Sequence, residues 1–201
     1  MSLCHEGPQS GRRKHPNWGH PDHDACGTGF VAQLGSPPSH DIILHALTAL
    51  ERLTHRGGVD ADGASGDGAG LLTSIPEAFF RARAAEQGIE LTEHFGLGFA
   101  FFPAGASTEA RASVEAAADT ERLRILGWRR VPVATASLGR MALETMPETW
   151  QFFVAPFHAT RGPSRFEWRL ALLRKRAESL LPPSTQCVRE GSSTSEIESA
   201  R

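Results

Sequence analysis

The composition of the chain changes abruptly at Cys26. Residues 1–25 hold four histidines, three prolines and three glycines with scarcely any aliphatic side chains, so they cannot bury enough apolar surface to become ordered. After Cys26, small residues lead into an apolar and β-branched run through Leu34, and the turn-forming cluster 35–38 ends it. This change predicts a leader over residues 1–25 and a strand that begins at or just after Cys26.

Periodicity predicts helices and strands along the rest of the chain. Ser39 can cap a helix that has one apolar face and that ends at Gly57-Gly58. The Gly-rich acidic run 58–70 predicts a tight loop. Ser164 and Glu167 form a capping box before a long amphipathic helix. The further predicted elements are strands over 71–75, 95–102, 128–133 and 149–157, helices over 76–87, 107–126 and 164–181, and a disordered tail over 182–201.

The charge balance and the apolar runs argue against two classes of function. Lys and Arg number 21 against 23 Asp and Glu, which leaves a net charge of −2 and no long-range field for nucleic acid. No run approaches about 18 consecutive apolar residues, and residues 1–25 lack the apolar core of a secretory signal. Three scattered cysteines are too few for a disulfide framework. These observations predict a cytoplasmic protein that binds neither nucleic acid nor membranes.

Two interpretations of Cys26 follow from its surroundings. By composition alone, a cysteine at the start of a strand is more often a small buried hydrophobic residue than a reactive thiol. Cleavage at the end of the leader would instead make Cys26 the N-terminal residue, and an α-amine with a pKa of roughly 7.7 to 8.0 can take the thiol proton near neutral pH. Gly27 and Gly29 lack a Cβ and would let a substrate approach the thiolate closely.

Several motifs follow one another in a definite order along the chain. They are Asp24-Ala25-Cys26-Gly27-Thr28-Gly29-Phe30, His55-Arg56-Gly57, Ser65-Gly66-Asp67-Gly68-Ala69-Gly70, Leu126-Gly127-Trp128 and Leu172-Leu173-Arg174-Lys175-Arg176. This joint pattern covers roughly residues 22 to 180. It resembles the start of the glutamine amidotransferase domain of the glutamate synthase large subunit, a class II (N-terminal-nucleophile) amidotransferase domain.

The resemblance implies a fold and a set of site residues. The fold is α+β, a four-layer αββα sandwich of the N-terminal-nucleophile hydrolase type, in which removal of the leader exposes the cysteine. Cys26 would attack the side-chain amide of glutamine, release ammonia and return to the free thiol when its γ-glutamyl thioester is hydrolysed. Arg56 would hold the backbone near the nucleophile by forked hydrogen bonds, although an exposed arginine favoured by the helix macrodipole fits the same position. The residues expected to bind substrate or shape the site are Arg56, Gly27, Gly66, Asp67 and Gly68.

The resemblance also implies partners outside this chain. Ammonia would pass to a synthase domain or subunit that uses FMN, an iron–sulfur cluster and an electron donor, whereas this chain is expected to hold no cofactor and no metal. Cys4, Cys26 and the leader histidines match no structural zinc spacing. The run 66–70 lacks the Gly-Lys-Ser/Thr of a phosphate loop, and the pattern at 27–32 opens a strand where a dinucleotide fingerprint would open a helix.

The chain departs from the family in its oxyanion donors. An Asn-Gly pair supplies them in the family, but Asn17 is the one asparagine of this sequence and lies within the leader. The sequence turns Ser-rich after Leu181, so we expect a partial amidotransferase domain over 26–181 that is truncated and impaired on its own. A second hypothesis stays open, namely a non-catalytic binding or regulatory module that keeps the first half of the fold. Loss of residues 1–25 from the mature protein would support the catalytic hypothesis, whereas their retention would favour the non-catalytic module.

Overall fold

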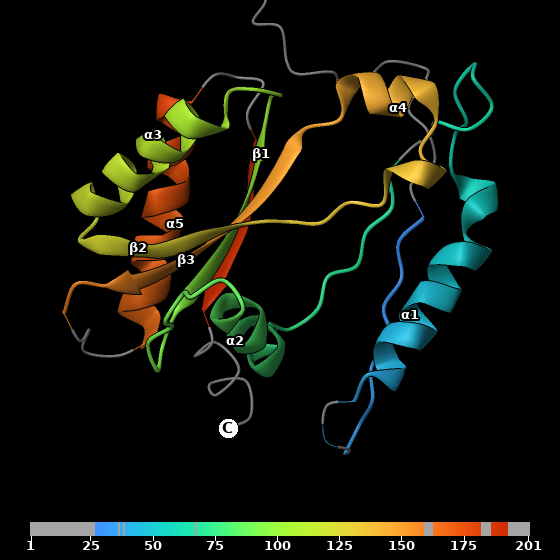
Figure 1. Cartoon of the computed structure of the whole chain (residues 1–201). Coiled ribbons are helices and arrows are strands. Elements are labelled where there is room, and N and C mark those ends of the chain that lie inside the picture. The colour runs from blue at the N-terminus through green and yellow to red at the C-terminus, as the bar shows by residue number, and fades with distance from the viewer. Residues whose placement is uncertain are drawn as a thin grey trace, which may run out of the picture. The chain divides into compact units, whose positions relative to one another are not determined.

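The computed structural model describes residues 27–35, 37, 39–66, 68–158, 163–181 and 186–192. The chain divides into two compact units, which we describe separately (Figure 1). The first unit comprises Met1–Gly58 with Asp67–Ala69, and the second comprises Val59–Gly66 with Gly70–Arg201.

The first unit contains helix α1 (Asp41–Arg52) and the short 3-10 helix η1 (Thr54–Arg56). Asp41 in the first turn and Arg52 in the last turn of α1 complement the helix macrodipole. The predicted cap at Ser39 is wrong, because the N-cap residue is His40 and no side chain caps the helix. No residue of α1 is fully buried.

The strand predicted from Cys26 onwards is not formed by the described residues that follow it. Residues 27–33 have no regular secondary structure, and Phe30 and Leu34 are each 93% exposed. A strand is defined by its hydrogen-bonded ladder, and the described residues of the first unit provide no partner strand. Apolar and β-branched composition therefore predicted a strand for which the described part of this unit offers no ladder. Cys26 itself lies outside the described residues.

The second unit is built on a four-stranded antiparallel sheet with the strand order β2-β3-β1-β4. The strands are β1 (Gly96–Phe102), β2 (Leu123–Arg130), β3 (Glu148–Pro156) and β4 (Gln186–Ser192). The predictions over 95–102 and 149–157 are confirmed as β1 and β3. Where the sequence predicted a disordered tail from residue 182, the backbone of β4 pairs with the otherwise open edge of β1.

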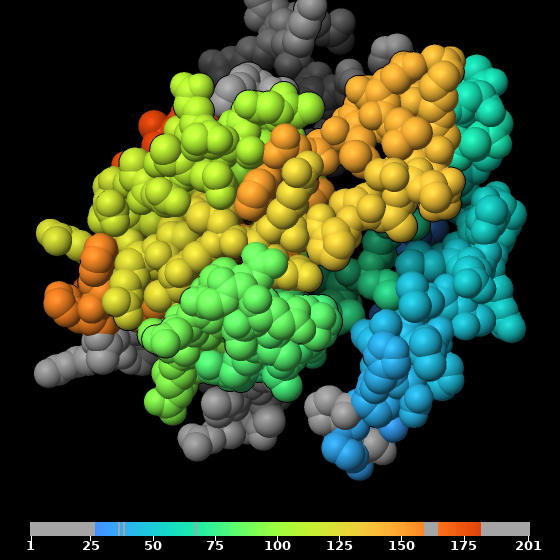
Figure 2. Space-filling view, in the orientation of Figure 1, coloured from blue at the N-terminus to red at the C-terminus, as the bar shows by residue number. Residues whose placement is uncertain are grey.

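Helices cover both faces of this sheet because its central strands bury side chains in both directions. Phe152 and Val154 of β3 join the core beneath α3 (Ser107–Thr120) and α5 (Pro163–Leu180). Phe153, between them, faces the opposite way and packs with Phe80 of α2 (Glu77–Ala85). In the space-filling view, α3 and the neighbouring β2 form one continuous surface, coloured yellow-green and yellow (Figure 2).

Several predicted boundaries and one predicted strand differ in the structure. The helix expected over 107–126 ends at Thr120, because Arg122 adopts a positive φ of 59° and Leu123 already begins β2. That strand therefore starts earlier than the predicted residue 128. Residues 71–75 do not form the predicted strand. The stretch between β2 and β3, which has no clear sequence pattern, contains η2 (Thr135–Ser137) and helix α4 (Arg140–Thr145).

The helices and the antiparallel sheet confirm the predicted α+β class. The described residues contain one sheet, so the predicted second sheet of the sandwich remains a prediction. Of the helices in the described part of the chain, none has the length and apolar character needed to cross a membrane.

Candidate functional site

The predicted site residues fall on two segments of the chain. Cys26 and Asp67 lie outside the described residues. Gly27, Arg56 and Gly68 are described in the first unit, and Gly66 is described in the second.

Gly27, the residue that follows the predicted nucleophile, packs against the end of the first helix. A Cβ built on Gly27 would lie 3.4 Å from Cβ of Arg56 and 3.4 Å from Cδ2 of Leu53. A methyl group at this exposed position would be in van der Waals contact with both side chains. The structure therefore brings together two of the predicted site residues, Gly27 and Arg56. A Cβ on Gly68 would meet nothing within 4 Å, so no close approach requires glycine there.

The position of Arg56 is determined by the way α1 ends. The helix stops at Arg52, and the backbone N–H of Arg56 then donates to the carbonyl of Leu53 at 2.8 Å to close η1. The N–H of Gly57 donates to the carbonyl of Thr54 at 3.2 Å, and Gly57 leaves in an extended conformation. This short turn places Arg56 over Gly27 and directs the chain into the Gly-rich loop.

The Gly-rich loop closes on itself between Val59 and Gly66. These two residues form an isolated antiparallel bridge, and the N–H of Asp60 donates to the carbonyl of Ser65 at 2.8 Å. Gly63 adopts a φ of +70°, a conformation that glycine reaches without strain, within the tight loop predicted over 58–70. Gly66 is therefore part of a closed turn.

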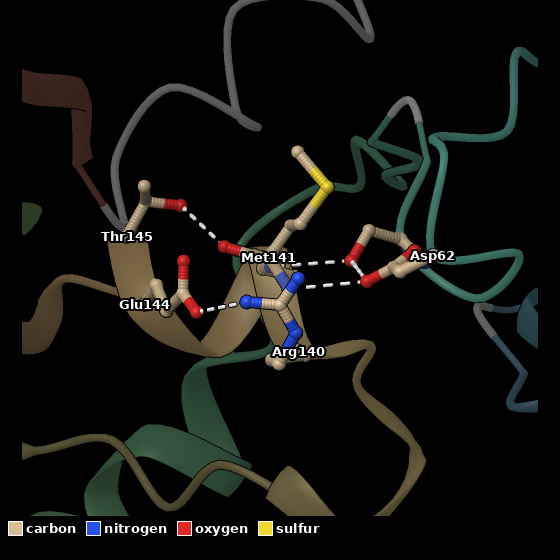
Figure 3. A network of polar contacts seen from close by, with 7 residues as sticks. Asp62, Arg140, Met141, Glu144 and Thr145 are labelled. Carbon is tan, nitrogen blue, oxygen red and sulfur yellow. Dashed lines mark hydrogen bonds and ion pairs between the residues drawn. The ribbon is translucent and has the colours of Figure 1, made fainter.

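Asp62 and Ser65 attach this loop to the first turn of α4, as Figure 3 shows for Asp62. Asp62 Oδ2 accepts the N–H of Met141 at 3.1 Å, and Ser65 Oγ accepts the N–H of Ala142 at 3.0 Å. The Ser65 hydroxyl donates to Asp62 Oδ2 at 2.6 Å. Hydrogen bonds from the Ser65 hydroxyl, and then from the N–H groups of Ser65, Met141 and Ala64, hold the pKa of Asp62 well below its ordinary value.

Ser65 begins one of the motifs noted in the sequence, but the sequence indicated no role for Ser65, Asp62 or their partners on α4. The order Asp62-Gly63-Ala64-Ser65 is typical of a turn in which an aspartate accepts hydrogen bonds from residues that follow it, so the local part was open to prediction. The bond from Ala142 joins residues that are 77 positions apart, and no local pattern indicates it.

The described residues offer no site for a metal. Within the described ranges, no group of three or more His, Cys, Asp or Glu side chains is arranged to hold a metal ion. His55 Nδ1 lies 3.0 Å from the carbonyl oxygen of Arg52, so this ring is engaged at the end of α1.

A family model of class-II glutamine amidotransferases matches residues 26–190 of the chain. The match begins at Cys26, the predicted nucleophile, and extends into β4. It covers all the predicted site residues, including the two that lie outside the described part of the structure.

The chain is also similar to individual proteins of known name. It is 45% identical over 134 residues to ferredoxin-dependent glutamate synthase 1 of Arabidopsis thaliana, which covers 65% of this chain and 8% of that protein. It is 37% identical over 162 residues to the glutamate synthase [NADPH] large chain of Bacillus subtilis, which covers 79% of this chain and 10% of that protein. The large chain of Azospirillum brasilense is 35% identical, over 78% of this chain and 11% of that protein. The matched region thus spans about a tenth of the length of these relatives.

Proposed function

Because the chain belongs to the class-II glutamine amidotransferases, we propose that it takes glutamine as its substrate and releases ammonia through a thioester on Cys26. The chemistry needs one thiol and one amine on the same residue. Removal of residues 1–25 supplies that amine at Cys26.

The reaction proceeds in two steps. The free α-amine of Cys26 accepts the thiol proton, and the thiolate attacks the side-chain carbonyl carbon of glutamine. The carbon–nitrogen bond breaks, the leaving nitrogen takes the proton from the amine, and ammonia departs. Water then attacks the γ-glutamyl thioester, which yields glutamate and restores the thiol.

The observation that carries the proposal is the packing of Gly27 against Arg56. A Cβ built on Gly27 would lie 3.4 Å from Cβ of Arg56, so the backbone next to the proposed nucleophile lies beside the arginine of the His-Arg-Gly motif. The guanidinium group of Arg56 can then donate forked hydrogen bonds to the backbone around Cys26. The start of the family match at residue 26 supports the same assignment.

Two finer properties belong to this proposal. The fold is the four-layer sandwich of N-terminal-nucleophile hydrolases, with Gly66, Asp67 and Gly68 in a loop that shapes the glutamine pocket. The mature chain hydrolyses glutamine slowly on its own, because Asn17 is the one asparagine of the sequence and lies in the leader. Loss of one oxyanion donor costs about a hundred- to a thousand-fold in rate.

The ammonia passes to a synthase domain or subunit that makes glutamate. The relatives are named glutamate synthases, and the matched region is about a tenth of their length, so the acceptor site belongs to sequence beyond this region. FMN, an iron–sulfur cluster and an electron donor belong to that acceptor in this proposal, and no residue of this chain is assigned to them. A cytoplasmic location stays a prediction.

The test combines N-terminal sequencing with active-site labelling. The purified full chain is treated with a diazoketone that mimics glutamine, and the labelled residue is located by peptide mass. We expect mature molecules to begin at Cys26 and to carry the label there. Cys26→Ser removes the label, whereas the matched control Cys187→Ser keeps it.

Two results would contradict the proposal. One is native protein that begins at Met1 or Ser2 and never at Cys26. The other is mature protein in which Cys26 is free but stays unlabelled at concentrations of diazoketone that saturate other amidotransferases. Fast turnover of glutamine by the chain alone would contradict only the claim about missing oxyanion donors.

A further inference from the structure

We propose that Thr54 and His55 are positioning residues for Arg56 in the proposed amidotransferase site. Their side chains reach back to the end of α1 and fix the short turn η1, whose two ends lie beside Gly27. We call these two residues the η1 clasp. The inference rests on the proposed function, because that function gives Arg56 its role beside the backbone of the nucleophile. All of these residues belong to the first unit.

The two ends of η1 both lie beside Gly27. A Cβ built on Gly27 would be 3.4 Å from Cδ2 of Leu53, and 3.4 and 3.6 Å from Cβ and Cγ of Arg56. Leu53 and Arg56 are joined by the 2.8 Å backbone hydrogen bond that closes the turn. The turn therefore sets the spacing of the two side chains that flank this glycine, and opening it would move Arg56 away from Leu53 and Gly27.

Side chains take the place of a glycine cap at the end of α1. Many helices end at a glycine with a positive φ, but Gly57 has a φ of −99° and is extended. The hydroxyl of Thr54 donates to the carbonyl of Glu51 at 2.5 Å, and Nδ1 of His55 donates to the carbonyl of Arg52 at 3.0 Å. The last four carbonyls of a helix have no acceptor role in its α-helical ladder. The clasp thus gives a side-chain donor to two of them in succession.

Local hydrogen bonds matter at this end because little packing supports it. No residue of α1 is fully buried, and Thr54, His55 and Arg56 are all exposed. Tertiary packing, which stabilises most helices in proteins, therefore contributes little here. The loss of one ordinary hydrogen bond shifts an equilibrium about fivefold. Without the clasp, we expect the turn to open locally while the sheet of the second unit stays folded.

The clasp has a structural task in the proposed reaction and transfers no proton. The α-amine of Cys26 already accepts the thiol proton and returns it to the leaving nitrogen. Nδ1 of His55 is occupied as a donor to the carbonyl of Arg52, since a carbonyl oxygen only accepts. The expected effect of the clasp is therefore on the placement of Arg56, and the reactivity of the thiol itself should not depend on it.

Conservative and disruptive variants can be paired at both positions. Thr54→Val removes the hydroxyl but keeps the β-branched shape, whereas Thr54→Ser keeps the hydroxyl. His55→Asn places an amide N–H near the position of Nδ1, whereas His55→Gln places it near Nε2, out of reach of the carbonyl of Arg52. Asparagine is not a base at neutral pH, so recovery by His55→Asn separates positioning from proton transfer. Thr48→Val is the matched control, because Thr48 donates to the carbonyl of Leu44 at 2.9 Å within the same helix.

Three measurements on the purified full chain test the proposal. We expect Thr54→Val and His55→Gln each to lower the maximal rate of Cys26 labelling by the diazoketone about fivefold, because misplaced site residues are costly. Thr54→Ser, His55→Asn and Thr48→Val should be labelled at the wild-type rate. Alkylation of Cys26 by iodoacetamide should be unchanged in every variant. Amide hydrogen exchange over residues 50–58 should rise in the two disruptive variants, whereas peptides from α5 should keep their protection.

Four results in the variants would overturn the inference. They are unchanged exchange over residues 50–58 in both disruptive variants, faster exchange there with an unchanged labelling rate, a parallel fall in the iodoacetamide rate, and failure of both Thr54→Ser and His55→Asn to restore labelling. A wild-type chain that begins at Cys26, reacts with iodoacetamide and resists the diazoketone would instead overturn the proposed function. The role of the clasp would then fall with it. The two failures are distinguishable, because one is seen in the variants and the other in the wild type.

Discussion

Gly98 illustrates how a single residue governs the packing of the sheet. A Cβ on Gly98 would overlap the ring of Phe152, which lies directly opposite on β3, and would be 2.7 Å even from Cε2. Phe152 is held in turn by Trp128, with 5.0 Å between the ring centroids. Because the Phe152 ring is buried and packed on Trp128, a side chain at position 98 would displace it, and β1 favours glycine there.

At this scale we predict that Gly98→Ala destabilises the second unit by roughly 1–3 kcal/mol, the usual cost of overpacking a core. The matched control is Gly70→Ala, where a Cβ would meet nothing within 4 Å and no positive φ is involved. The control should lower the free energy of unfolding by less than about 0.5 kcal/mol or leave it slightly higher than in wild type. Urea unfolding followed by tryptophan fluorescence measures both. Equal effects of the two substitutions would contradict this account of Gly98.

At the scale of elements, Glu148 connects β3 to the turn that precedes α3. It is the first residue of β3, and its carboxylate accepts the N–H of Gly105 and the indole N–H of Trp150, each at 3.2 Å. The bond from Gly105, followed by those from the Ser107 hydroxyl and from Trp150, lowers the pKa of Glu148 below its ordinary value of 4.5. The ionised form is therefore the form that holds the turn.

This lowered pKa predicts how stability changes with pH. Because the pKa of Glu148 is lower in the folded than in the unfolded chain, its contribution is present above the unfolded value of 4.5 and is lost as the pH falls through the folded value. We expect wild type to melt about 1 °C above Glu148→Gln at neutral pH, a small difference because solvent screens the group. Thermal unfolding from pH 7 to pH 3.5 should show this difference constant above about pH 6 and shrinking below pH 4.5. A difference that grows on acidification would contradict the prediction.

At the scale of the whole molecule, the two units differ in how much they bury. The second unit contains two apolar clusters, one on each face of its sheet, with Phe95, Phe102 and Phe153 fully buried among them. In the described part of the first unit, α1 buries no residue fully. Since tertiary packing provides most of the stability of helices in proteins, α1 lacks the support that α5 receives.

We therefore expect the amides of α1 to exchange with solvent roughly a hundredfold faster than those of α5. Helix α5 is the internal control, because it is also amphipathic but buries Phe166, Leu170 and Leu173 in the core. Hydrogen exchange followed by mass spectrometry of peptides from the two helices measures the ratio. Equal protection of α1 and α5 would show that the first unit is packed more firmly than its burial indicates.

The sequence alone was enough to identify the features that depend on near neighbours. The helices over 41–52, 77–85 and 163–180 follow from apolar spacing and turn residues, and β1 and β3 follow from β-branched and aromatic runs. The family was also readable from motifs in order along the chain. The resemblance placed Arg56 near the nucleophile, and in the structure a Cβ built on Gly27 would lie 3.4 Å from Cβ of Arg56; the roles of both residues stay predictions.

Tertiary structure alone decided the features that depend on a distant partner. Residues 27–33 look like a strand but have no ladder among the described residues, whereas Gln186–Ser192 look like a polar tail but pair with the open edge of β1. The bonds from Asp62 and Ser65 to α4 likewise join residues far apart along the chain. The physical reason is the same in each case. The type of a residue tells which hydrogen bonds it can donate or accept, but only the fold determines which partner it meets.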